Sequence, residues 1–248
     1  MDHIPTVTIA GVRVDDIELA SLYDVLESWL QGTGRVRHIV TVNPEYIMEA
    51  RKNKAFRKCL ERSALALADG VGIVYAARYL YGQKIQRITG VDAVLTLADL
   101  CARASKGIYL LGADTGVAKR AADELEKRFP GLRVSGSEAG PFNQPAILDR
   151  DICERITTSG AHVLLVAFGS PKQDLWIARH MDFLPGVRIA IGVGGTFDYL
   201  AGVVRRAPGI IRTLGFEWLY RLMRQPHRWR RIFTAIARFP LTVIFSKK

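Results

Sequence analysis

The chain has 248 residues, of which 49% are hydrophobic and 24% are charged, a composition that excludes a disordered tail, a collagen-like fibre and a disulfide-stapled miniprotein. Its formal net charge is +11, and nearly all of that charge belongs to the segment 203–248, which holds eleven Lys and Arg residues and one acidic residue. A near-neutral body with a cationic end needs an anionic partner: phosphate, acidic lipid or nucleic acid.

The first 202 residues alternate short aliphatic runs with amphipathic segments, which is the pattern of βαβ units and a mostly parallel sheet. The predicted strands are Val7–Ile9, Val36–Val40, Ala64–Ala68, Ile108–Leu111, Arg133–Ser135, His162–Ala167 and Arg188–Ile191. The predicted helices cover residues 16–31, 44–53, 71–80, 91–105, 115–129, 146–159 and 171–183. We therefore expect a Rossmann-like α/β catalytic domain over residues 1–202, in which helices flank a mostly parallel sheet.

After Gly202 the pattern changes to helical segments that are separated by prolines, one of them Pro226, and are rich in Arg and Trp. We expect a basic, amphipathic helical appendage over residues 203–248. Its apolar run 232–245 is about half the length of a bilayer-spanning helix and contains a charge and a proline, so it is expected to lie on a membrane rather than cross it. The side chains expected to face the bilayer interface are Trp218, Trp229, Phe233, Ile236, Phe239, Ile244 and Phe245.

The cysteines and the N-terminus favour a reducing, cytoplasmic environment. Cys59, Cys101 and Cys153 lie far apart without a CxxC motif, and the N-terminus lacks the basic and apolar regions of a signal peptide. The five histidines are scattered, and we expect no metal site. The Asp-x-Asp pair, Asp149 and Asp151, falls in a predicted helix, where a solvated face is the favoured interpretation.

Polar turns follow several predicted strands, at the edge where parallel sheets bind ligands. Asp69 follows the third strand; a turn or cap residue is the commoner role there, and a general base is the functional alternative. Thr41 and Asn43 follow the second strand, and an N-cap before Pro44 explains Asn43 without a substrate. Arg87 is either a surface cation or a fork for phosphate or carboxylate.

Glycine-rich turns offer candidate anion sites at three other strand ends. Gly169 and Lys172 lie at a predicted helix start, where backbone N–H groups can face a phosphate. Gly112 and the pair Gly194 and Gly195 lie in turns that do not match GxGxxG, and no P-loop motif occurs, so NAD and P-loop ATP interpretations lose support. We keep these five residues as candidate nucleotide-binding positions.

Seven blocks occur in order along the chain: VTVNPEYI, ALADGVGIVYAAR, QRITGVD, VAFGSPKQD, GVGGTFDYLAG, RRAP and GFEWLYRL. Together they resemble the WecG/TagA/CpsF family of bacterial glycosyltransferases. The resemblance implies an inverting, metal-independent enzyme without a cofactor, which moves a sugar from a UDP-sugar to polyprenyl-diphosphate-linked N-acetylglucosamine for cell-surface polysaccharide or teichoic acid synthesis. It implies peripheral attachment to the anionic inner face of the plasma membrane. N-acetylmannosamine in a β-1,4 linkage is the first expectation, and UDP-glucose or UDP-N-acetylmannosaminuronic acid is the alternative donor.

The resemblance also implies residue roles. Asp69 is similar to the family's catalytic base. The positions similar to its pocket residues for sugars and diphosphate are Thr41, Asn43, Arg87 and Gln173, and those similar to arginines that close over the site are Arg221, Arg228 and Arg231. The chain departs from the family pattern at Asp174, where Glu is common, and at Phe216, where Leu is common.

The proposed chemistry accounts for these residue types. A base takes the proton of the acceptor hydroxyl as that hydroxyl attacks the anomeric carbon, and arginines neutralise the departing diphosphate. A different class stays open: a non-enzymatic α/β module whose basic end binds nucleic acid or acidic membrane, whereas the enzyme interpretation expects no nucleic-acid partner. A soluble nucleotide-sugar hydrolase or epimerase would need neither the basic end nor a lipid acceptor. A homo-oligomer also stays open.

Overall fold

The computed structural model describes residues 4–140, 147–205, 207–209, 211, 217–224 and 229–246. A six-stranded sheet forms its centre, with strand order β4-β3-β8-β7-β5-β6 and parallel pairing throughout. The strands are β3 (Arg37–Val42), β4 (Leu65–Ala68), β5 (Gly107–Gly112), β6 (Arg133–Glu138), β7 (Ala161–Ala167) and β8 (Ile189–Gly192). This arrangement confirms the expected parallel α/β sheet.

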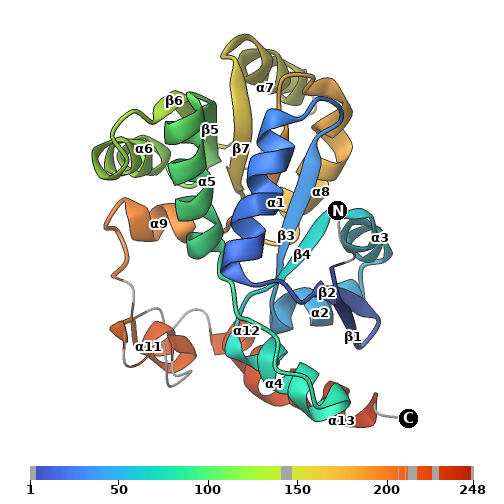
Figure 1. Ribbon diagram of the computed structural model, residues 1–248. Coiled ribbons are helices and arrows are strands. Elements are labelled where there is room, and N and C mark those ends of the chain that lie inside the picture. Colours follow the sequence, from blue (N-terminus) through green and yellow to red (C-terminus); the bar gives the residue numbers. More distant parts are fainter. Residues whose placement is uncertain are drawn as a thin grey trace.

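Helices cover both faces of this sheet (Figure 1). One face packs against α1 (Leu19–Gln31), α5 (Gly90–Ala104) and α6 (Val117–Arg128). The other packs against α2 (Pro44–Ala50), α3 (Lys54–Arg62), α4 (Val71–Tyr81), α7 (Ile147–Thr158) and α8 (Lys172–His180). Neighbouring strand residues point to opposite faces, so Ile39 joins the first core and Val40 the second.

The predicted strand at Val7–Ile9 exists, but it does not belong to the parallel sheet. β1 (Thr6–Ile9) pairs in antiparallel register with β2 (Val12–Asp15), which the sequence analysis did not predict. Ala10 and Gly11 both have positive φ, 47° and 82°, as a tight two-residue hairpin turn requires. The hairpin lies against β4, where the Asp15 carboxylate accepts a hydrogen bond of 2.8 Å from the backbone N–H of Ala66.

Several predicted helix boundaries are wrong. The helix expected over 44–53 ends at Ala50, and α3, which was not predicted, begins four residues later, at Lys54, because Asn53 caps it by accepting from the Phe56 N–H. The segment expected as one helix over 171–183 is α8 followed by a 3-10 turn, η1 (Met181–Phe183). A short helix, α9 (Thr196–Leu200), follows β8 and was not predicted.

The C-terminal part contains α11 (Glu217–Arg224), α12 (Trp229–Phe233), a π-helical turn η3 (Thr234–Arg238) and α13 (Phe239–Phe245). α13 contacts α2 and α4, and Figure 1 shows it beside α4 at the lower end of the molecule. None of the helices within the described ranges is long and apolar enough to span a bilayer. Pro226 lies outside the described residues, and the division into domains at residue 202 stays a prediction.

The expectation that Phe239 faces the membrane is wrong. Its side chain is 2% exposed and shares a core cluster with α2, α3 and α4. A Cβ atom on Gly72 of α4 would lie 3.6 Å from the Phe239 ring, so the glycine leaves room for this contact. Phe239 therefore anchors the C-terminal helices to α4.

Candidate functional site

The carboxyl ends of β3, β4 and β8 meet around Gly90, the first residue of α5. The backbone N–H of Gly90 donates to the Asp69 carboxylate over 3.4 Å. A Cβ atom on Gly90 would lie 3.4 Å from Oγ1 of Thr196 and 3.8 Å from Cγ2 of Thr41. Three strand ends thus bring Asp69, Thr41 and Thr196 to one place, which the predicted topology anticipated for Asp69 and Thr41.

Asp69 is half-buried where β4 leads into α4. Its backbone N–H donates to the carbonyl of Val42 over 2.8 Å, which joins it to the end of β3. The N-cap of α4 is Gly70, with φ +110°, so Asp69 does not cap that helix. A carboxylate held by the backbone and partly open to solvent at a strand end meets the geometric requirement for a general base.

Thr41 and Asn43 are both engaged in internal hydrogen bonds. The Thr41 hydroxyl is buried and donates to the carbonyl of Gly192 over 3.3 Å, joining β3 to β8. The Asn43 side chain accepts from the Tyr46 N–H over 3.1 Å and caps α2, with Pro44 as the first helical residue. The structural interpretation of Asn43 is confirmed, and the contact of either residue with a substrate stays a prediction.

Gln173 is inside the protein, and both ends of its amide have partners. The side chain is 2% exposed. Its Nε2 donates to the Tyr46 hydroxyl over 2.8 Å, and its Oε1 accepts from the backbone N–H of Gly194 over 3.0 Å. Gln173 therefore connects the start of α8 to α2 and to the turn after β8. Direct contact of this side chain with sugar or diphosphate stays a prediction.

A buried carboxylate completes this network. Asp174 is 0% exposed; its Oδ2 accepts from the Tyr46 hydroxyl over 2.7 Å, and its Oδ1 lies 3.3 Å from Nε2 of His38. Burial raises the pKa of Tyr46 well above its ordinary value, and the charge of Asp174 raises it further, so Tyr46 stays a neutral hydrogen-bond donor. The sequence analysis assigned no role to Tyr46 or His38 and treated Asp174 only as a departure.

Arg87 lines a cavity of about 480 Å³ that opens beside the Asp69 turn. The cavity is lined by Val71, Val74, Lys84, Ile85, Gln86, Arg87 and Gly209. The segment carrying Arg87 is held at the end of β4, because the Ile88 N–H donates to the Ala68 carbonyl over 3.0 Å. Two cationic side chains and apolar side chains of α4 thus line the same cavity. Thr89 caps α5 through a reciprocal capping box with Asp92.

Three of the four candidate nucleotide-binding glycines have structural reasons of their own. Gly112 cannot accept a side chain, since a Cβ atom there would lie 2.7 Å from the carbonyl carbon of Ala167 in β7. Gly169 and Gly194 have φ values of +76° and +51°, which favour glycine. At Gly195 a Cβ atom would lie 3.5 Å from Oδ2 of Asp198, which is an ordinary contact that a side chain tolerates. Nucleotide binding at these residues stays a prediction.

Lys172 is exposed as the first residue of α8, next to the cis peptide bond between Ser170 and Pro171. The side chains of Arg221 and Arg231, and the whole of Arg228 and Phe216, lie outside the described residues. Their predicted closure over the diphosphate is therefore carried forward as a prediction.

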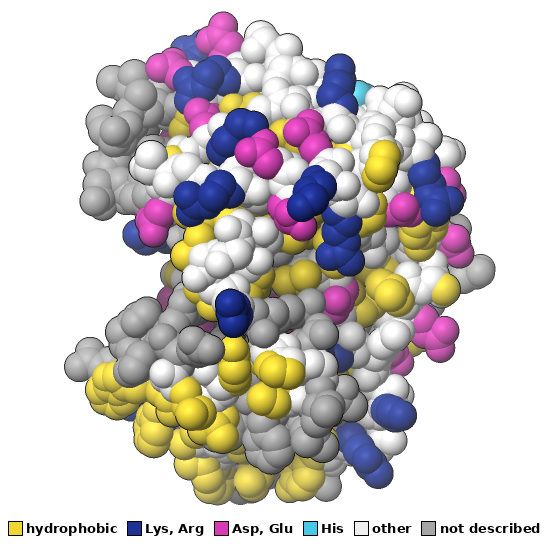
Figure 2. Space-filling view, turned by 90° about the vertical axis from the view of Figure 1, so that its left-hand side faces the viewer, with side chains coloured by type: hydrophobic (Ala, Val, Ile, Leu, Met, Phe, Trp, Pro, Cys, Tyr) yellow, Lys and Arg dark blue, Asp and Glu magenta, His cyan; other side chains and the backbone are white. Residues whose placement is uncertain are grey.

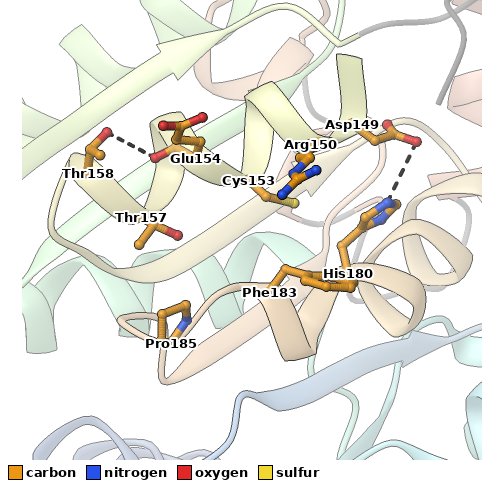
Figure 3. Close-up of a pocket in the computed structure, with 9 residues that line it drawn as sticks. All are labelled: Asp149, Arg150, Cys153, Glu154, Thr157, Thr158, His180, Phe183 and Pro185. Carbon is orange, nitrogen blue, oxygen red and sulfur yellow. Dashed lines mark hydrogen bonds and ion pairs between the residues drawn. The ribbon is translucent and has the colours of Figure 1, made fainter. Parts of the chain in front are cut away.

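A second, larger cavity of about 790 Å³ lies between α7 and the segment from α8 to η1 (Figure 3), and its lining contains none of the candidate site residues. The Asp149 carboxylate, expected on a solvated face, accepts from Nε1 of Trp176 over 2.9 Å and lies 3.7 Å from Nε2 of His180. Asp149 keeps 20% of its side chain exposed, so it is only partly withdrawn from the solvated face that was expected. Within the described ranges, no cluster of three or more His, Cys, Asp or Glu side chains is arranged to hold a metal ion.

The doubly wound sheet and its polar strand ends define an α/β protein that binds its ligand at the carboxyl edge. A model of the glycosyl transferase WecG/TagA/CpsF family matches residues 7–248. The chain belongs to this family and is a glycosyltransferase, which confirms the resemblance carried by the seven sequence blocks.

Two curated relatives match this chain over most of its length. A protein of Bacillus spizizenii (strain ATCC 23059 / NRRL B-14472 / W23) is 32% identical over 220 residues, covering 88% of this chain and 83% of the relative. A protein of Bacillus subtilis (strain 168) is 31% identical over 245 residues, covering 98% and 93%. Both are named N-acetylglucosaminyldiphosphoundecaprenol N-acetyl-beta-D-mannosaminyltransferase. The interpretation as a non-enzymatic binding module is not favoured.

Proposed function

We propose that this glycosyltransferase moves N-acetylmannosamine from a UDP-sugar to the N-acetylglucosamine of a polyprenyl-diphosphate-linked acceptor, forming a β-1,4 bond. The names of the two relatives support the transferred sugar and the acceptor. The observation that carries the mechanism is the position of Asp69, half-buried where three strand ends meet and two residues before Val71, which lines a cavity with two cationic side chains.

In the proposed mechanism Asp69 accepts the proton of the acceptor's hydroxyl while the hydroxyl oxygen attacks the anomeric carbon of the donor. The bond from that carbon to the UDP oxygen breaks on the opposite face, and UDP leaves with the bonding electron pair. Cationic side chains stabilise the charge that grows on the diphosphate. We assign this role to Arg221, Arg228 and Arg231, so that the reaction needs neither a metal ion nor a cofactor.

The acceptor is proposed to lie along α4. Val71 and Val74 form the apolar wall of the smaller cavity, and Lys84 and Arg87 supply positive charge on its other side. This pairing of an apolar wall with cations suits a prenyl chain that ends in a diphosphate. The helix begins directly after the Asp69 turn, so a lipid diphosphate held there presents its sugar toward the base.

We propose that the lower end of the molecule docks on the anionic inner face of the plasma membrane. We define the apolar end as the exposed side chains of α4, η3 and α13: Tyr75, Tyr79, Ile236, Leu241, Ile244 and Phe245. Figure 2 shows hydrophobic side chains gathered at the lower end of this view. Arg78 and Arg238 are exposed on the same helices and suit acidic lipid.

The test is a transfer assay with the full chain. UDP-N-acetylmannosamine, UDP-N-acetylmannosaminuronic acid and UDP-glucose are each incubated with a prenyl-diphosphate-N-acetylglucosamine analogue, with and without EDTA. We expect a β-linked disaccharide from the first donor, unaffected by EDTA. Preference for another donor would overturn the assignment of the sugar, and loss of activity in EDTA would overturn metal independence.

Asp69→Asn is measured beside Asp114→Asn, a matched control because Asp114 is an exposed aspartate in the turn after β5. Asparagine keeps the shape of the side chain but cannot accept the proton, so we expect a loss of about 10³-fold in kcat for the first variant and little change for the second. Equal rates in the two variants would remove Asp69 from the role of base.

A further inference from the structure

The buried network beneath the site has one direction of hydrogen bonding. The Asp174 carboxylate can only accept, so the Tyr46 hydroxyl must donate to it and use a lone pair to accept from Nε2 of Gln173. That leaves Oε1 of Gln173 facing the N–H of Gly194. The charge of Asp174 thus sets which way the Gln173 amide points. Three successive hydrogen bonds connect this carboxylate, through Tyr46 and Gln173, to the turn after β8.

The network also packs closely against the end of β8. A Cβ atom on Gly192 would lie 2.5 Å from Nε2 of Gln173 and 2.6 Å from Oδ1 of Asp174. The carbonyl of Gly192 accepts from Thr41, and the carbonyl of Val193 would lie 3.8 Å from a Cβ atom on Gly90. A displacement of this turn would therefore reach Thr41 and Gly90, and through Gly90 the carboxylate of Asp69.

We propose that the Tyr46–Asp174 pair is a positioning device that orients the Gln173 amide and thereby holds the turn after β8, at Gly194, in the conformation that the site requires. The pair acts through Gln173 and touches no substrate. Its effect on turnover rests on the proposed function, whereas its effect on the Gly194 turn does not.

The first test compares Tyr46→Phe with Tyr109→Phe. Tyr109 is a matched control, because it is 5% exposed and its hydroxyl donates to a carboxylate, that of Glu138, over 2.8 Å, on β5 and β6 at the other side of the sheet. Both changes remove one buried hydroxyl. Only the first removes the group that fixes the direction of the Gln173 amide.

Hydrogen exchange gives a readout that does not depend on activity. We expect the amide of Gly194 to exchange about tenfold faster in Tyr46→Phe than in Tyr109→Phe, because its acceptor is then free to turn away. We expect kcat to fall about tenfold to a hundredfold in Tyr46→Phe, with KM changed less than kcat, because misplacement of the site costs rate. Unchanged exchange at Gly194 would overturn the proposal whatever the activity.

A second variant guards against a simple folding defect. Gln173→Glu keeps an acceptor for the Gly194 N–H, but only its protonated form can also donate to Tyr46. The side chain at this position faces Tyr46 of α2, and the neighbouring Asp174 is faced by His38 of β3, Tyr46 and Cys59 of α3. Burial and the Asp174 charge favour protonation of the introduced carboxyl group as the pH falls.

We therefore expect the ratio of Gln173→Glu to wild-type kcat to rise about tenfold between pH 8 and pH 6, measured where circular dichroism shows both proteins folded. A ratio that stays constant would overturn the proposal. The positioning role and the proposed function can fail independently. If Asp69→Asn is inactive while Tyr46→Phe and Gln173→Glu behave as wild type, only the positioning role fails. If no donor yields product, the hydrogen-exchange comparison still decides it.

Discussion

The carboxyl ends of β3 and β8 bury polar side chains, whereas α4 and the C-terminal helices expose apolar ones. At the first region Gln173, Asp174 and Tyr46 are withdrawn from solvent and joined by hydrogen bonds of 2.7 to 3.0 Å. At the second, Tyr75 is 62% exposed and Phe245 is 75% exposed. Both regions reverse the ordinary distribution of side chains.

The difference separates two kinds of function. A buried polar group costs free energy unless it is fully bonded, so a complete network fixes one geometry at the site. An exposed apolar group is disfavoured in water until another surface covers it, so it marks a place of docking. The buried polar network fixes the positions of atoms at the site, and the exposed apolar side chains form the proposed docking surface.

Of the effects expected from this comparison, the largest concerns the exposed region. Replacing Ile244 and Phe245 together with serine removes two large side chains from the apolar end, and we expect binding to vesicles with anionic lipid to weaken about 100-fold. Sedimentation with vesicles measures this change. Turnover of a water-soluble, short-chain acceptor should persist.

The matched control is Phe183→Ser. Phe183 is 66% exposed on η1, outside the apolar end, and its loss should leave vesicle binding within twofold. Equal weakening in both proteins would show that the apolar end is not the docking surface.

A smaller effect is expected from crowding the buried region. In Gly192→Ala the added methyl group meets Gln173 and Asp174 at 2.5 to 2.6 Å, and overpacking of this kind costs about 1–3 kcal/mol of unfolding free energy. We expect a lower midpoint in urea together with a loss of kcat. Gly186→Ala is the control, because its nearest neighbour, the carbonyl of Ala161, is 3.7 Å away. Wild-type behaviour of Gly192→Ala would mean that the network tolerates displacement.

A buried carboxylate outside the site gives a pH-dependent comparison. Burial raises the pKa of Asp15 above 3.8, although the hydrogen bond from Ala66 and the charge of Arg13 oppose the shift. The folded state then binds this proton more tightly than the unfolded state, so its contribution to stability is present at low pH and is lost as the pH rises through the raised pKa. Asp15→Asn abolishes that dependence.

We expect Asp15→Asn to match the wild type within about 1 kcal/mol at pH 7, and the wild type to gain relative to it as the pH falls toward 4. Urea unfolding across this range measures the difference, with the exposed Asp24→Asn as control. A variant that gains relative to wild type at low pH would contradict the assigned direction.

The smallest expected effect is on the cysteines. Burial raises the pKa of Cys59 and Cys101 to about 12 and that of Cys153 to about 11. Thiolate is the reactive form, so alkylation by iodoacetamide at pH 8 should be negligible in the folded protein and complete after unfolding. Mass spectrometry counts the modified residues. Rapid modification of Cys59, whose thiol donates to the Asp174 carbonyl, would reveal that the buried network opens.

The parallel sheet could be predicted from sequence because buried strands are continuous apolar runs that end in polar or glycine-rich turns. Asp69, Thr41 and Asn43 were found for the same reason, since they follow such runs directly. The hairpin of β1 and β2 was missed because β2, VRVD, alternates apolar and charged residues instead of forming a continuous apolar run. The helix α3 was missed although its apolar residues, Phe56, Cys59 and Leu60, share a buried face.

The buried network could not be predicted in this way. Tyr46 and Asp174 are separated by 128 positions in the chain, and His38 and Asp174 by 136. Periodicity and local motifs describe neighbours on one element, whereas these contacts depend on how α2, β3 and α8 pack together. Gln173 was identified through the family resemblance, but its withdrawal from solvent became visible only in the structure.

The sheet order has a consequence for how two very different substrates meet. β4 is the outermost strand on its side of the sheet, so Asp69 lies at one end of the row of strand ends that forms the candidate site. A nucleotide sugar arrives by three-dimensional diffusion from water, whereas a lipid carrier travels only within the plane of its bilayer. With the enzyme docked through the apolar end as proposed, a base at the end of the row would let each carrier reach it and leave while still embedded in its leaflet.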